Sequence, residues 1–279
     1  MQTVKSEDIR PAAVAGLFYP DDPKSLDDEI TYLIEKGVGD FEGEIRALVC
    51  PHAGYMYSGL VAASGYRLLE NQNYSVVAVI SPSHHEYFRG VSVFNGKGYR
   101  TPLGLMPVAR ELADELIGRD ERIFSSWVGH GEEHGLEVQL PFLQKVLNEV
   151  RIIPIVMGDQ DSETCHMLAE TLHAVLKDVP SLLIASSDLS HYHPYQTAAR
   201  IDKSTCDLID SYDDEGLMQA LERGTCEACG GGPVVAAMRA SKKMGSVSSK
   251  VLVYQNSGDV TGDHSRVVGY VSAAFGNVN

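Results

Sequence analysis

Three segments of the sequence place histidines directly after short apolar runs. These segments are "LVCPHAGY", which contains His52, "VISPSHHEY", which contains His84 and His85, and "IASSDLSHYHPY", which contains Asp188 and His191. Imidazole binds Zn, Cu, Fe and Ni, and it also transfers protons near neutral pH. Together these residues could form a metal centre with an acid/base group beside it.

A mononuclear site with two imidazoles typically takes a third, anionic ligand. The segment "GTCEACGGGP" offers Cys226, Glu227 and Cys229 as candidates. Cys229 leads into a glycine run and a predicted helix start, whose positive end would favour the metal-binding thiolate. We therefore favour Cys229, with a buried inert cysteine as the alternative.

Two further residues have a functional and a structural interpretation. His134 lies three residues before Glu137 in "GHGEEHGLEVQL", so the two share a helix face if the helix has begun by then, as a metal or substrate pair. The alternative is a capped, solvated helix start. Asp188 could accept a ring N–H and so orient an imidazole, or it could cap a turn.

These residues must be positioned by alternating strands and helices. Short apolar runs predict strands at residues 46–50, 75–81, 91–94, 151–157, 181–187, 250–255 and 267–275. Longer patterns predict helices at residues 58–70, 108–117, 137–148, 162–177, 196–212, 214–222 and 233–244.

This alternation predicts an α/β fold, a three-layer α/β/α sandwich with a mainly parallel but mixed central sheet. No linker-like change of composition divides residues 1–279, so we expect a single domain. Ligands of such sheets bind beyond the carboxyl ends of the strands, so His52, His84, His191 and Cys229 are expected in one pocket.

Composition and missing motifs exclude several classes of function. The formal charge of -15 and the lack of a Lys/Arg cluster argue against nucleic acid or an anionic membrane as the main partner. The sequence shows neither a membrane-spanning apolar stretch nor a secretory signal, and five irregularly spaced cysteines indicate a reduced, cytoplasmic protein. Nucleotide-binding glycine motifs and a GxSxG nucleophile elbow are also absent.

The order of several motifs resembles the Memo family. The matching segments are "AGLFYP", "PHAGYMYSG", "SPSHHEYF", "YRTPLG", "EEHGLEVQLPFL", "SSDLSHY" and "CGGGPV", and they extend over nearly the whole chain. Memo proteins are similar to class III extradiol dioxygenases, which hold non-haem Fe(II) on two histidines and one carboxylate. In the Memo family a cysteine replaces the carboxylate.

The resemblance implies that His52, His84 and Cys229 occupy the metal-type positions. His191 matches the pocket histidine that serves as acid/base in the dioxygenases, and Asp188 matches another pocket position, as does His134. Because a thiolate is softer than a carboxylate, it favours Cu or Zn and is itself oxidisable, so dioxygenase activity cannot be carried over to this chain.

Three functions fit these residues. The first is redox or oxygenase-type chemistry at an Fe(II) or Cu centre. The second is a non-catalytic module that binds a small molecule, a peptide or a phosphopeptide, as in the signalling role of animal Memo proteins. The third is a zinc hydrolase, because two histidines, one cysteine and a water form an acceptable catalytic zinc shell.

Overall fold

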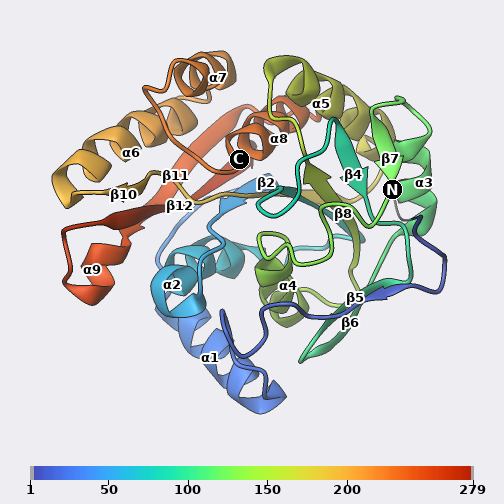
Figure 1. The fold of residues 1–279 in the computed structure, drawn as a ribbon, viewed down its shortest axis with the longest axis horizontal. Helices are drawn as coiled ribbons and strands as arrows, with labels where there is room; N and C mark the ends of the chain where they lie inside the picture. The colour runs from blue at the N-terminus through green and yellow to red at the C-terminus, as the bar shows by residue number, and fades with distance from the viewer. Residues whose placement is uncertain (1–2, 278–279) are drawn as a thin grey trace.

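The computed structural model describes residues 3–277, which are built around a nine-stranded mixed sheet (Figure 1). The strand order is β10 (His191–His193), β12 (Val267–Asn277), β2 (Glu44–Cys50), β9 (Ser181–Ser186), β3 (Val76–Pro82), β8 (Arg151–Met157), β4 (Val91–Val93) and β7 (Ile123–Ser125), with β11 (Ser248–Asn256) paired to β12. The central strands β2, β9, β3 and β8 are parallel, whereas β12 joins β2 and β4 joins β8 in antiparallel fashion.

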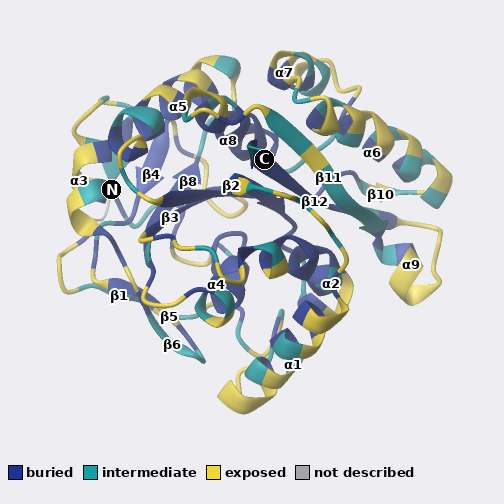
Figure 2. Cartoon of the chain, turned by 180° about the vertical axis from the view of Figure 1, so that it is seen from behind, coloured by how far each residue is buried: buried dark blue, intermediate teal, exposed yellow. Residues whose placement is uncertain are grey.

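Helices cover both faces of the sheet (Figures 1 and 2). On one side lie α1 (Pro23–Lys36), α2 (Tyr55–Tyr66) and α4 (Leu140–Val146), and on the other α5 (Ser162–Leu176), α6 (Tyr195–Asp210), α7 (Asp214–Glu222) and α8 (Gly231–Lys243). The central strands are buried on both faces because they consist of Val, Ile, Leu and Ala; every residue of β3 and β9 is buried.

Shorter elements complete the chain. Helix α3 (Arg110–Ile117) lies near α5, α9 (Ser257–Thr261) connects β11 to β12, and 3₁₀ turns occur at η1 (Arg67–Leu69) and η2 (Glu137–Gln139). A separate three-stranded sheet contains β1 (Ile9–Arg10), β5 (Gly98–Thr101) and β6 (Gly104–Pro107).

The three-layer α/β/α sandwich with a mixed, mainly parallel sheet is therefore confirmed. All seven expected strands are present, whereas α1 was not predicted. Its start is marked by Asp22, which accepts the backbone N–H of Ser25, and by Pro23 in the first turn. The one-domain organisation of residues 1–279 stays a prediction. Within residues 3–277, no helix combines the length and apolar character that a membrane span requires.

Three parallel neighbours bring the candidate residues to one edge of the sheet. Strand β9 lies between β2 and β3, and Cys50 at the end of β2 pairs with Ser186 at the end of β9. His52, Asp188 and His84 each lie two residues beyond the end of their strand. The parallel register thus places all three within one layer above the sheet edge.

Candidate metal centre

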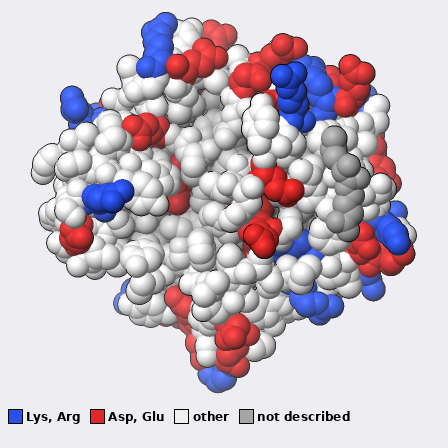
Figure 3. All heavy atoms as spheres, viewed as in Figure 1, with Lys and Arg blue, Asp and Glu red and all other residues white. Residues whose placement is uncertain are grey.

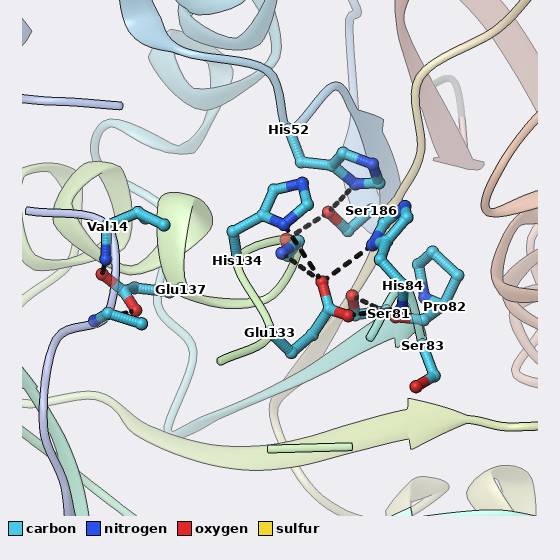
Figure 4. A network of polar contacts seen from close by, with 12 residues as sticks. Val14, His52, Ser81, Pro82, Ser83, His84, Glu133, His134, Glu137 and Ser186 are labelled. Carbon is cyan, nitrogen blue, oxygen red and sulfur yellow. Dashed lines mark hydrogen bonds and ion pairs between the residues drawn. The ribbon is translucent and has the colours of Figure 1, made fainter. Parts of the chain in front are cut away.

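His52, His84 and Cys229 come together where β2, β3 and the start of α8 meet. One potential ligand atom from each of them lies within 4.8 Å of the others. Nε2 of His52 is 3.1 Å from Sγ of Cys229. A tetrahedral ion would hold a nitrogen and a sulfur about 3.5 Å apart, so a small outward movement would admit one. Figure 4 shows the rings of His52, His84 and His134 pointing toward one another.

The tautomer of His52 follows from its hydrogen bonds. Nδ1 lies 2.9 Å from Oγ of Ser186, and that hydroxyl donates its only proton to the carbonyl of Gly135. Ser186 must therefore accept from His52, so Nδ1 carries the hydrogen and Nε2 keeps its lone pair. Burial lowers the pKa of His52 to about 3, so the ring is neutral at physiological pH. A neutral imidazole with a free Nε2 is the form that binds metals.

Glu133 fixes His84 in the same way. Oε1 of Glu133 lies 2.8 Å from Nδ1 of His84, and Oε2 accepts the backbone N–H of His84. Burial lowers the pKa of His84, but the hydrogen bond to Glu133 and its negative charge outweigh burial and raise that pKa. Burial likewise raises the pKa of Glu133, yet His84 and two backbone N–H groups hold it at about 2. The ionised carboxylate keeps the hydrogen on Nδ1 and leaves Nε2 of His84 for a metal.

Cys229 differs from the expectation of a preformed thiolate. Burial, followed by the charge of Asp188, raises the pKa of the Cys229 thiol, so the start of α8 does not ionise it unaided. A bound cation would supply the missing stabilisation. The backbone N–H of Asp188 points at the sulfur, 3.3 Å away. Cys226, in contrast, is buried and contacts Thr205 of α6.

Asp188 lies at the centre of the strand exits, but it does not orient an imidazole in the way proposed from the sequence. Its Oδ1 accepts the backbone N–H of His52 at 2.8 Å, which ties the exit of β2 to that of β9. Its own backbone N–H and C=O contact Cys229. Burial raises the pKa of the Asp188 carboxyl. Asp188 therefore holds three chain segments of the site in position.

His134 lies in the site, but its expected partner does not. The ring of His134 stacks on His84 at 4.7 Å, and burial lowers its pKa to about 4. Glu137 begins η2 and forms a buried ion pair with Arg10 instead (Figure 4 shows it apart from the histidines). Glu133 and Glu137 are 3% and 0% exposed, so a solvated helix start is wrong for this segment.

His191 stands beside this cluster on a cavity of about 560 Å³ that also exposes Cys229. Its Nδ1 lies 2.8 Å from the carbonyl oxygen of Leu189. Because a carbonyl only accepts, Nδ1 carries a hydrogen, and Nε2 is left to take or give a proton. His85, next to His84, is exposed, and its ring lies in a distant edge contact with His134.

The sequence reasoning missed Glu133, Ser186 and Gln139. Gln139 donates to Ser186 and to the carbonyl of Pro51, which supports the hydroxyl that holds His52. The signal for Glu133 was its position beside His134, but a carboxylate in a charged run usually faces solvent. Glu133 also completes a second potential metal group with His84 and His134.

The chain is thus an α/β/α protein with a cluster of potential metal ligands at the carboxyl edge of its parallel strands. Residues 10–274 match the family described as Memo-like protein. MEMO1 family proteins of Methanosarcina mazei and Methanobrevibacter smithii are 40% and 38% identical to it, covering 95% and 96% of this chain and 98% and 99% of theirs. The chain belongs to the Memo family.

A distant structural relative shares the fold. The crystal structure of an uncharacterized protein from Escherichia coli K12 superposes with a TM-score of 0.58 at 14% identity, covering 84% of this chain and 100% of that one. This likeness concerns the path of the chain alone.

Proposed function

We propose that this Memo family protein binds one redox-active transition-metal ion, Fe(II) or Cu, through His52, His84 and Cys229. The observation that carries the proposal is the 3.1 Å approach of Nε2 of His52 to Sγ of Cys229, in a ring whose Nδ1 is already bonded to Ser186. Two imidazoles and one sulfur form a donor set that suits Cu, Fe or Zn.

The proposed activity is redox or oxygenase-type chemistry on a small molecule, in keeping with the resemblance to extradiol dioxygenases. The bound metal would supply Lewis acidity and electron transfer. Nε2 of His191 would exchange a proton with a substrate in the adjoining cavity, while the hydrogen bond to Leu189 keeps the ring oriented. Glu133 and Ser186 would hold the two ligand rings in position.

The first test is the metal content of protein purified without chelators or a metal-binding tag. We expect about one Fe or Cu per chain by mass spectrometry, since residues 3–277 contain one His/His/Cys group and it suits one ion. His52→Ala and His84→Ala should each lower metal affinity at least tenfold. Loss of a residue that supports a ligand lowers metal affinity about 10–100-fold, and loss of the ligand itself should lower it at least as much. The matched control is His85→Ala, which removes the adjacent exposed imidazole.

Uptake of Zn without any O₂ consumption would favour a hydrolase instead. A folded protein that takes up none of these metals would leave only the non-catalytic binding module. Circular dichroism of each variant distinguishes loss of a ligand from loss of the fold.

A further inference from the structure

The cavity beside Cys229 has the size and lining of a small-molecule site. Its volume of about 560 Å³ falls within the range of ligand pockets. Cys229 and His191 open onto it together with apolar side chains of α7, Met218 and Leu221. Buried Leu189 contributes to its floor. A ligand there would contact both apolar walls and the candidate centre.

The charged residues that line this cavity are all acidic. They are Asp161, Glu222 and Glu227, and none of its fourteen described lining residues is Lys or Arg. Glu227 is paired with His193, and Asp161 caps α5 through Thr164. Glu222 is exposed at the end of α7, and its side chain makes no hydrogen bond or ion pair with the described residues. The rim therefore offers a free carboxylate to a ligand.

The start of α8 does not compensate for this negative lining. The N–H groups at a helix start would normally attract an anion. Here Gly230 donates to Oγ of Ser187, Gly231 to the carbonyl of Ala228, and Gly232 to Oε1 of Gln160. The next residue, Pro233, has no N–H. The donors that would bind a phosphate or carboxylate are thus already used within the protein.

The net charge, and the charges on one face of the molecule, agree with this acidic lining. On the face drawn in Figure 3, basic side chains are interspersed with acidic ones and form no continuous patch. The formal charge of the chain is -15. Long-range attraction, like the local lining, therefore favours cations over anions.

We propose that this cavity is the substrate site of the metal centre and that it selects a small apolar amine in its cationic form. The apolar part would lie against Met218 and Leu221, and the ammonium group would face Glu222 at the rim. The role as substrate site rests on the proposed function, whereas the ligand class rests on the cavity alone. A phosphopeptide is disfavoured by the same charges.

Three probes with a common phenyl group and similar chain length test the ligand class: 2-phenylethylamine, 2-phenylethanol and 3-phenylpropionate. Their affinities are measured by calorimetry or NMR titration, on the protein as purified. We expect the amine to bind about tenfold more tightly than the acid at low ionic strength, with the alcohol between them. The difference should shrink in high salt because rim charges are screened.

Variants of Glu222 locate the effect. Glu222→Gln should weaken amine binding about two- to fivefold and leave the alcohol unchanged, the range expected for an exposed ion pair. Glu222→Lys should abolish or reverse the preference for the amine. Glu35→Gln removes the same charge from exposed Glu35 on α1, on the opposite side of the sheet, and should change nothing.

The inference is overturned if the acid binds the unaltered protein as tightly as the amine or more tightly, or if none of the probes binds. It is also overturned if Glu222→Gln and Glu35→Gln change the affinity for the amine equally. Metal analysis keeps the two proposals apart. Amine selectivity in a protein that binds no metal contradicts the proposed function and supports the ligand class. Metal binding without amine selectivity supports the proposed function and contradicts the ligand class.

Discussion

At the scale of residues, the site is defined by which ring nitrogen is left free. His52, His84 and His191 each have Nδ1 bonded, to a hydroxyl, a carboxylate and a carbonyl respectively. Each partner accepts the hydrogen, so all three rings keep the lone pair on Nε2. Two of these lone pairs serve the proposed metal and the third serves proton transfer. The sequence identified the three histidines, but not the partners that select their tautomers.

Glu133 provides a test of this arrangement. Replacing it by Gln removes the charge that holds the hydrogen on Nδ1 of His84, so metal affinity should fall about 10–100-fold. Competition titration with a chromophoric chelator measures the change. Glu132→Gln, which alters the adjacent exposed glutamate, should bind metal as the unaltered protein does. Equal affinities for both variants would mean that Glu133 does not support the ligand.

The two nearby cysteines can be distinguished by alkylation. Cys229 faces His52, whereas Cys226 contacts Thr205, so a bound metal should protect Cys229 and leave the labelling of Cys226 unchanged. The measurement is peptide mapping after alkylation of the folded protein, metal-free and metal-loaded. Protection of Cys226 alone would mean that Cys226, and not Cys229, is the metal ligand. Protection of neither would favour the group of His84, Glu133 and His134.

At the scale of elements, the parallel strands could be predicted and the 130–137 segment could not. Strands β2 and β3 end in apolar runs, so their ends, and hence His52 and His84, were evident from the pattern. The buried carboxylates Glu133 and Glu137 depend on Arg10 and His84, which are distant in sequence. No local pattern reveals such a pairing. Helix α1, by contrast, was not predicted, although its sequence carries an N-terminal cap and an apolar stripe.

Arg10 anchors the 130–137 segment to the start of the chain. Its buried side chain donates to the carbonyls of His130 and Glu133 and pairs with Glu137. Arg10→Met leaves the buried carboxylate of Glu137 without its ion-pair partner, so the free energy of unfolding should fall by about 3–5 kcal/mol. The double variant Arg10→Met/Glu137→Gln should lose less of its free energy of unfolding, because neither charge of the pair remains.

Urea unfolding measures both changes. Lys24→Met, which removes an exposed ion pair with Asp28, is the control and should cost about 0.5 kcal/mol or less. If the double variant is as unstable as Arg10→Met, the pair acts through packing rather than through charge.

At the scale of the whole molecule, buried neutral histidines link stability to pH. Burial lowers the pKa of His130 to about 3, and its Nδ1 lies 2.6 Å from the hydroxyl of Tyr99. In the unfolded chain a histidine titrates near about 6.5. Between these two values the unfolded state binds more protons, so His130 stabilises the fold fully above about pH 6.5 and loses that contribution as pH falls.

Replacing His130 by Asn removes this titration while keeping a hydrogen-bonding side chain beside Tyr99. The metal-free variant should be less stable at neutral pH, since a buried ring is lost. Between about pH 6.5 and 5, the free energy of unfolding of the variant should fall less steeply than that of the unaltered protein. The difference between the two slopes should be up to about 1.4 kcal/mol per pH unit. Urea unfolding at several pH values measures the slope. His166→Asn alters an exposed side chain and should keep the slope of the unaltered protein. A histidine that stays neutral in the fold but is protonated in the unfolded chain must make the free energy of unfolding fall as pH falls. An unchanged slope in His130→Asn would therefore assign the acid sensitivity to other buried groups.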